Sequence, residues 1–396
     1  MKINYQKNKF VILFIIILFG SILRGYNINF NDFWSDEMVS FFLSNPNKSL
    51  TETINLIFNS NLMITFELIL KFFHQIFGYD LYLSRYLTLF FSIVSIIYFY
   101  KLMNNNDKSI AALLGIILIA INIYHIRYSI ELRSYTLTFL LGLILLNLIF
   151  LDGYIKKNIK TLNYLIIFFI VLGMLFSHAY SIIIIISLNL YILLFYLLRK
   201  NYTKNYFYIF FSISLATAFF LYFYLNNITH TPTWIPELKS SFYSNYFFSS
   251  FFGSRLVGGI HLVTLIYLVL RFLKKIYLDF DIKLFCIILI LLTYLIPITY
   301  SLIFEPILID RYIFFVLIPI LYLLSALTTQ IKNNLLKYFF VIILIVPSFF
   351  NHFSENTFKQ FYTKIYPSKP DVKSAFYHIV KSKNLANYRF NSYQKY

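Results

Sequence analysis

The chain is short of charge, of breaks in its apolar runs and of cysteine, and each shortage excludes a class of protein. Only 13% of its 396 residues are charged while 59% are hydrophobic, a balance that does not build a soluble domain. The apolar runs lack the glycine and proline breaks that are typical of discontinuous transporter helices. The chain has one cysteine, Cys286, inside an apolar run, and a single cysteine cannot form an internal disulfide.

Sequence motifs for several common chemistries are also absent. The chain has no GxxxxGK[ST] phosphate loop, no GxGxxG after a strand, no HExxH and no CxxC. ATP-driven pumping, Rossmann cofactors and Cys-based metal sites therefore have no support. The net charge of +18 comes mostly from short Lys and Arg tracts between apolar runs, so it indicates membrane topology rather than nucleic-acid binding.

What the sequence does contain is a series of apolar runs of about 15 to 20 residues, each long enough to cross or nearly cross a bilayer as a helix. They predict an all-α polytopic membrane protein with about eleven transmembrane helices. The expected spans are 10–23, 82–100, 109–126, 136–151, 162–177, 180–198, 206–225, 260–273, 283–301, 312–327 and 338–350.

The charges between the spans predict the orientation of the chain. Every second connection carries Lys or Arg, which places the N-terminus in the cytoplasm. Most acidic residues then lie on the extracytoplasmic side. We therefore expect any acid–base chemistry to take place at the outer face.

The predicted spans form one transmembrane domain, residues 1–350, and a short polar, basic tail follows at 351–396. The side of the membrane on which this tail lies stays open. The sequence shows no internal repeat and no separate soluble catalytic domain. Three outer segments carry most of the remaining polar residues: a long first loop at 24–81, a motif at 124–135 and a loop at 226–259.

The first outer loop contains a strongly apolar stretch, residues 61–77, that is interrupted by polar side chains. Glu67, Lys71 and His74 follow one another at spacings of four and three residues, so they share one face of a helix. This pattern favours an amphipathic helix lying along the membrane surface over a further span.

Carboxylates cluster beside a tryptophan directly after the first apolar run. Asp32, Asp36 and Glu37 surround Trp34, and ionisable groups this close to hydrocarbon are costly unless they face water or protein, which indicates function. The structural alternative is that Ser35 caps a helix, with Asp36 and Glu37 in its first turn, where the helix dipole favours negative charge. The two interpretations are compatible, because capping can fix a catalytic carboxylate.

A second polar cluster lies between the third and fourth predicted spans. On a helix Tyr124, Tyr128, Glu131 and Tyr135 share one face, with Arg127 and Arg133 on its flanks. Tyrosine rings and hydroxyls suit a sugar, and guanidinium groups suit a phosphate. The alternative is an interfacial aromatic belt with a local Glu–Arg pair.

Further polar groups are expected on the same side of the membrane. Arg85 begins the second span, His178 lies between the fifth and sixth, and Asp310 and Arg311 precede the tenth. Taken singly, each has an ordinary structural explanation, since an exposed Asp–Arg pair contributes little to stability. Their convergence on one face favours a common site.

The order of these motifs resembles the membrane-embedded GT-C glycosyltransferases, and more closely the group of protein O-mannosyltransferases and lipid A aminoarabinose transferases. The matching pieces are Arg24, WSDE at 34–37, FGYD at 77–80, SRY at 84–86, YSIELRSY at 128–135, SHAY at 177–180 and DRY at 310–312. In one departure, NLMITFE at 61–67 stands where that group commonly has His-Pro-Pro-Leu-Tyr. Contacts made by that motif are therefore not carried over.

The resemblance implies an inverting glycosyltransferase that moves a sugar from a polyprenyl-phosphate donor to a hydroxyl of a glycan, lipid or protein outside the membrane. Asp36 would be the general base, with Glu37 as the alternative. The donor phosphate would be bound by Arg133, Arg311, Arg85 and His178. Substrate would be contacted by Trp34, Glu131, Tyr128, Tyr135 and Arg24.

Two questions stay open at this point. Some members of the wider fold use a divalent metal, and this sequence shows no committed ligand set, so a metal cofactor is neither assigned nor excluded. The alternative function is a transporter or flippase of lipid-linked glycans, which predicts charged groups near mid-span rather than at one membrane face.

Overall fold

The computed structural model describes residues 2–26, 28–29, 32–104, 109–151, 161–199, 204–227, 235, 249–279 and 281–353, and over these residues all regular structure is helical. The outer loop expected at 226–259 and the tail expected at 351–396 lie mostly outside the described residues. The expectation of an all-α multi-pass membrane protein is confirmed.

Seven of the described helical segments are long and apolar enough to cross a membrane. They are formed by α5 (Leu81–Met103), η3 with α10 (Ala179–Ser181, Ile182–Arg199), α11 (Lys204–Asn227), α14 (Arg255–Asp279), α15 (Ile282–Ile303), η5 with α16 (Asp310–Val316, Leu317–Thr328) and α17 (Asn334–Phe350). The pair α6 (Ser109–Ala120) and α7 (Ile123–Ser129), bent by 57°, makes an eighth if it is one span.

Shorter apolar helices account for the remaining runs of the sequence. They are the apolar part Phe10–Gly25 of α1 (Lys2–Gly25), α8 (Tyr135–Leu146) with the π-helical turn η2 (Asn147–Leu151), and α9 (Thr161–Leu175). Each lies where a span was expected. The total of about eleven transmembrane helices stays a prediction.

Helix α16 lies at the centre of the bundle. All twelve of its residues are buried, and it packs against α5, α6, α14, α15 and α17. A helix that is apolar all round has no face suited to water, so burial on every side is the arrangement its sequence favours. By contrast, peripheral helices such as α1, α11 and α17 keep large apolar side chains exposed, as lipid-facing helices do.

Helix α1 is held to the bundle by Arg24, in its last turn. This side chain is fully buried and its five N–H donors are all used: Nε donates to Ser92 Oγ, Nη1 to the carbonyls of Gly20 and Ala120, and Nη2 to the Ile119 carbonyl and His125 Nδ1. At the break between α6 and α7, Arg24 donates to the carbonyls of Ala120 and Ile119, and the Ile119 carbonyl also accepts the N–H of Asn122 at 3.3 Å. Arg24 is thus a clamp between α1, α5 and the α6–α7 bend.

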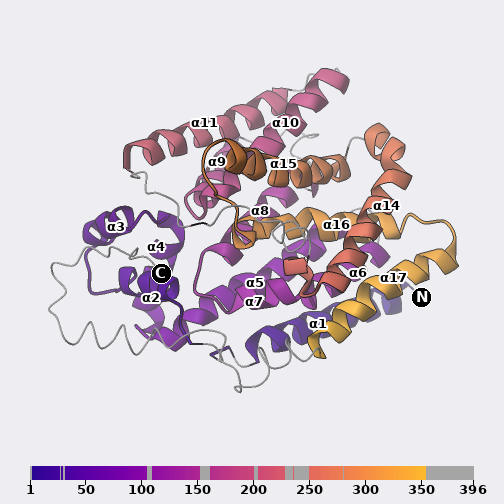
Figure 1. Cartoon of the computed structure of the whole chain (residues 1–396), viewed down its shortest axis with the longest axis horizontal. Helices are drawn as coiled ribbons and strands as arrows, with labels where there is room; N and C mark the ends of the chain where they lie inside the picture. The colour runs from indigo at the N-terminus through magenta and orange to yellow at the C-terminus, as the bar shows by residue number, and fades with distance from the viewer. Residues whose placement is uncertain are drawn as a thin grey trace.

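Three short helices, α2 (Ser35–Leu43), α3 (Leu50–Asn59) and α4 (Ile64–Phe77), lie together at one end of the long helices, opposite the start of α1 (Figure 1). They contact one another, and α4 packs on α5. The amphipathic pattern of α4 is present, but its polar face is turned inward, because Glu67, Lys71 and His74 are buried. Phe72 and Ile76 are exposed instead.

The buried polar side chains of α4 have partners in the turn between α2 and α3. Lys71 Nζ donates to the carbonyls of Asn45 and Lys48, both at 2.7 Å, and His74 contacts the Ser44 carbonyl at 3.2 Å. Backbone carbonyls in a turn need donors when they are buried. The inward polar face of α4 therefore fixes α2 and α3 against the bundle.

We predict that Arg24→Gln destabilises the protein strongly, because one amide cannot satisfy five buried acceptors. The expected loss is at least about 3 kcal/mol, since each hydrogen bond to a charged group contributes about 1.5 to 3 kcal/mol. The measurement is the thermal unfolding midpoint of the detergent-solubilised protein. The exposed Arg271→Gln is the control and should change the midpoint little; equal midpoints for both variants would contradict the clamp.

Candidate functional site

The site is built on the start of α2. The helix begins at Ser35, and Trp34, rather than the expected Ser35, is the capping residue. The carboxylate of Glu37 reaches back and accepts the backbone N–H of Trp34 at 3.0 Å. This is the contact by which a glutamate in a first turn satisfies an unpaired N–H at a helix start. Glu37 thus lies in the first turn of α2, as the structural alternative expected, although the cap is Trp34.

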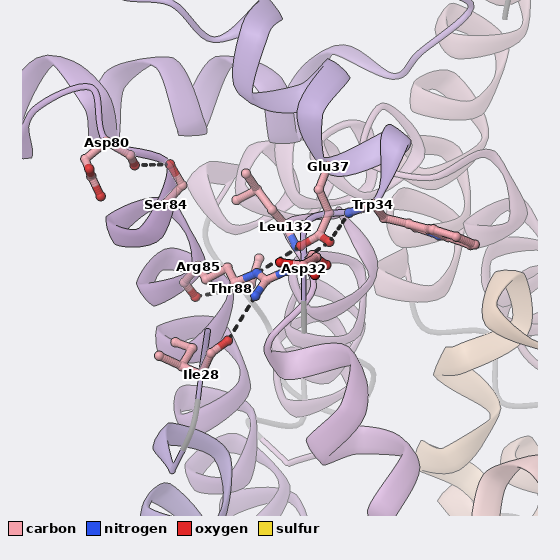
Figure 2. A network of polar contacts seen from close by, with 9 residues as sticks. All are labelled: Ile28, Asp32, Trp34, Glu37, Asp80, Ser84, Arg85, Thr88 and Leu132. Carbon is pink, nitrogen blue, oxygen red and sulfur yellow. Dashed lines mark hydrogen bonds and ion pairs between the residues drawn. The ribbon is translucent and has the colours of Figure 1, made fainter. Parts of the chain in front are cut away.

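Glu37 also makes a buried ion pair with Arg85 of α5 (Figure 2). Arg85 Nε donates to Oε1 and Nη2 to Oε2, both at 3.1 Å, and the backbone N–H of Leu132 donates to Oε1 at 2.9 Å. Glu37 is 0% exposed. With four donors on its two oxygens, this carboxylate has a positioning role, and we do not retain it as a general base.

Arg85 is engaged on its other side as well. It donates from Nη1 to the Ile28 carbonyl at 3.1 Å, and its guanidinium lies 3.8 Å from the centre of the Phe33 ring. The ion pair thus joins the chain before α2, helix α5 and the segment before α8. Because Arg85 is buried and bound to protein groups, it lies behind the site rather than in contact with a donor phosphate.

Asp36, the neighbour of Glu37, has a different environment. Its side chain is 38% exposed, and its Oδ2 lies 3.7 Å from Nη2 of Arg311 in η5. Arg133, before α8, donates from Nη1 to the backbone carbonyl of Asp36 at 3.2 Å. Two guanidinium groups from distant parts of the sequence therefore meet at Asp36, Arg311 at its carboxylate and Arg133 at its backbone carbonyl.

The charge on Arg133 is set by its surroundings. Burial disfavours the charged form, but the nearby Asp36, Tyr135 and Glu67 outweigh this effect and raise the pKa of Arg133 above its usual value. Arg133 is therefore a fixed cation across the physiological range. Fixed positive charge in a poorly hydrated site is suited to binding an anion.

His178 lies near Arg133 and Arg311 and is uncharged. Burial, together with the charges of Arg133 and Arg311, lowers its pKa to about 3. Its Nδ1 accepts the backbone N–H of Tyr180 at 3.3 Å, so the neutral ring carries its hydrogen on Nε2. His178 thus offers an uncharged N–H donor beside two cations.

The tyrosines predicted to contact substrate form a packed wall. Tyr128 and Tyr135 are buried, with ring centres 5.2 Å apart, and Tyr128 also packs on Phe314 at 5.6 Å. The Tyr135 ring lies 5.6 Å from that of His178. Glu131 is also buried, and its backbone carbonyl accepts the N–H of Arg133 at 2.7 Å. These residues shape and support the positions of Arg133 and His178.

The structure sorts the expected site residues into three groups. Asp36, Arg133, Arg311, His178 and Tyr135 come together. Glu37, Arg85, Glu131 and Tyr128 lie next to them in supporting positions, and the half-buried Trp34 lies at the start of α2 beside Asp36. Arg24 belongs to the α1 clamp, and with all five donors used there it is not retained as a substrate contact.

Two residues of the site were not identified from the sequence. Ser40 receives a hydrogen bond from Arg133 Nη1 at 3.2 Å, and Glu67 accepts one from Ser40 at 2.9 Å. Ser40 lies one helical turn after Asp36, so the i, i+4 spacing was a usable signal. Glu67 was recognised only as part of an amphipathic face.

A metal site is not supported by the side chains in this part of the chain. Among the described residues, no group of three or more His, Cys, Asp and Glu side chains is arranged to hold a metal ion. The nearest charged partner of Asp36 is a cation, Arg311, rather than a further carboxylate. The donor set does not fit a divalent metal, which takes several oxygen ligands, and no step below involves one.

Comparison with solved structures finds an oligosaccharyltransferase from the archaeon Archaeoglobus fulgidus. Its structure tethered with an acceptor peptide containing the NVT sequon matches 96% of this chain, with a TM-score of 0.56 and 10% identity. Its complex with Zn and sulfate matches 95%, with a TM-score of 0.56 and 12% identity. The chain has the GT-C fold.

The GT-C expectation is thus confirmed at the level of the fold. A third structure, the A. fulgidus enzyme AglB in complex with an inhibitory peptide and a dolichol-phosphate, covers 89% of this chain at 11% identity and a TM-score of 0.56. The chain spans only 56 to 57% of the length of these enzymes. Neither the protein-family models nor the curated proteins give a match. The closer likeness to protein O-mannosyltransferases and aminoarabinose transferases stays a prediction.

The contrast between the two adjacent carboxylates gives a stability prediction. Glu37→Gln should lower the free energy of unfolding by about 3 to 5 kcal/mol, because it leaves the buried Arg85 without its counter-charge. Asp36→Asn should change the free energy of unfolding by less than about 1 kcal/mol, because the ion pair between Asp36 and Arg311 is long and partly exposed. Thermal unfolding of both variants in the same detergent checks this. Equal losses would contradict the separate roles of the two carboxylates.

Proposed function

We propose that the chain is a glycosyltransferase that moves a sugar from a polyprenyl-phosphate donor to an acceptor hydroxyl at the extracytoplasmic face of the cytoplasmic membrane. The observation that carries the proposal is the meeting of Asp36 with Arg133 and Arg311 at one end of a GT-C fold. A carboxylate beside two cations suits a reaction in which one group loses a proton and another becomes a phosphate anion.

Asp36 is the proposed general base. It is the partly exposed one of the two adjacent carboxylates, so an acceptor can approach it. In the proposed step the acceptor hydroxyl attacks C1 of the sugar, its proton passes to Asp36, and the bond between C1 and the phosphate oxygen breaks. The electron pair of that bond leaves with the lipid phosphate, and the configuration at C1 is inverted.

Arg133, Arg311 and His178 are the proposed phosphate ligands. The two guanidinium groups supply positive charge before the reaction begins, which is how fixed donors stabilise charge that develops in a transition state. His178 adds a neutral Nε2–H donor. Asp36 and a bound phosphate repel each other, and the positive charge of Arg133 and Arg311 offsets this repulsion.

Other features support a lipid-linked donor. One structural neighbour, AglB, was solved with a dolichol-phosphate and an inhibitory peptide, and another structure of the neighbour with an acceptor peptide. The exposed apolar surfaces of the long helices suit a polyprenyl chain lying along the bundle. Trp34, next to Asp36, is half-buried and is the proposed aromatic contact for a sugar.

The direct test is transfer of radiolabelled sugar from polyprenyl-phosphate sugars to membrane acceptors. Asp36→Asn should lower the rate by about 10²- to 10⁴-fold, the usual contribution of a general base. The exposed Glu52→Gln on α3 is the matched carboxylate control and should transfer at the wild-type rate. Full activity of Asp36→Asn would remove Asp36 as the base. If the wild-type protein transferred no sugar from any donor, the transferase proposal itself would be wrong.

The phosphate role gives a second prediction. Arg311→Gln should weaken inhibition of transfer by free polyprenyl phosphate by about 10-fold or more, because a charge-assisted contact to the phosphate is lost. Asp36→Asn should bind the same inhibitor at least as tightly as wild type, because a negative charge beside the phosphate is removed. Competition binding with a labelled polyprenyl phosphate measures both. Unchanged affinity in Arg311→Gln would exclude this arginine as a phosphate ligand.

A further inference from the structure

Glu67 is a buried carboxyl group that the proposed reaction does not use. It projects from α4 and is 4% exposed. Its Oε1 accepts the hydroxyl hydrogen of Ser40 at 2.9 Å, and its Oε2 has no hydrogen-bond partner among the described residues. A buried carboxyl with one unsatisfied oxygen is costly to keep, so its retention beside the site needs a reason.

A chain of hydrogen bonds leads from Glu67 to the site. Arg133 Nη1 donates to Ser40 Oγ at 3.2 Å, and Ser40 in turn donates to Glu67. The same Nη1 donates to the backbone carbonyl of Asp36. One serine hydroxyl thus links a cation of the site with a carboxyl on a separate helix, and bonds that end on opposite charges strengthen one another.

The other ionisable groups around α4 have their own partners. On α2, Asp36 faces Arg311, and Glu37 is bound to Arg85 of α5. On α4 itself, Lys71 and His74 contact the α2–α3 turn. Glu52 of α3 is exposed.

The segment that follows α9 also touches α4, through the N–H of Thr65 and the Phe176 carbonyl at 2.9 Å. Its ionisable residue, His178, is neutral. Arg133 is the charged group that acts on Glu67 and favours its ionised form. The state of Glu67 and the position of Arg133 are therefore coupled.

We propose that Glu67 is a positioning residue that, when ionised, holds Arg133 beside Asp36 through the Ser40 hydroxyl, and that this coupling makes sugar transfer depend on pH near neutrality. The inference rests on the proposed function above. Glu67 contacts no substrate in this scheme and transfers no proton to one. The negative charge of Glu67 strengthens the hydrogen bond from Ser40 to Glu67 and, through it, the bond from Arg133 to Ser40. Protonation of Glu67 weakens both bonds.

The electrostatics support a transition in the physiological range. Burial raises the pKa of Glu67 to about 7, although Arg133 and the Ser40 hydrogen bond oppose the shift. Glu67 is therefore ionised above about pH 7 and neutral below it. The positioning effect is present on the alkaline side and is lost as the pH falls through the pKa of Glu67.

The test compares the pH dependence of transfer in wild type, Glu67→Gln and Ser40→Ala, with Glu52→Gln as control. Wild type and the control should lose about tenfold in rate between pH 8 and pH 6, the ratio expected when a charge-assisted hydrogen bond weakens. Glu67→Gln and Ser40→Ala should be slow at pH 8 and nearly flat across this range. A wild-type profile in both variants would overturn the proposal.

A second readout does not depend on activity. The measurement is the shift of the unfolding midpoint from wild type in Glu67→Gln, in Arg133→Gln and in the double variant. At pH 8 the shift of the double variant should differ from the sum of the two single shifts, and at pH 6 it should equal that sum, because the coupling requires an ionised Glu67. Additive shifts at both pH 8 and pH 6 would overturn the coupling, even if the enzyme is active. Coupling at pH 8 in a protein that transfers no sugar would leave the coupling in place and count against the proposed function instead.

Discussion

The site depends on the buried ion pair between Glu37 and Arg85. Removing both charges from water is expensive, and the pair is tolerated because every oxygen of Glu37 and several donors of Arg85 meet protein groups. It joins the start of α2, helix α5 and the backbone at Leu132. The chain on either side of Leu132 carries Glu131 and Arg133, so the same pair that fixes α2 also fixes the position of one proposed phosphate ligand.

The ion pair also separates the roles of two adjacent carboxylates. Successive residues on a helix point in directions about 100° apart, so Asp36 does not follow Glu37 into the protein and faces Arg311 of η5 instead. Glu37 is buried and held by four donors, whereas Asp36 keeps contact with solvent. A pair of acids with contrasting environments is how a site assigns one to structure and the other to proton transfer.

Composition and apolar run length were sufficient to predict an all-helical membrane bundle, because the bilayer imposes both. The convergence of Asp36, Arg133, Arg311 and His178 followed from topology, since all were expected at one membrane face. The orientation of single side chains could not be predicted in this way. Arg24 was expected at substrate because it precedes WSDE, but the last turn of α1 directs it into the bundle, where the broken α6–α7 helix supplies its acceptors.

Glu67 shows a further reason why sequence periodicity falls short. Periodicity identifies which residues share a helix face, but it does not say whether that face meets water or protein. In α4 the polar face meets protein because the α2–α3 turn and Ser40 offer partners that come from another part of the chain. The carboxyl group of Glu67 is therefore buried instead of exposed to water, and its proton affinity depends on Arg133. The inward polar face of α4 thus connects the short helices α2, α3 and α4 to the site by charge as well as by packing.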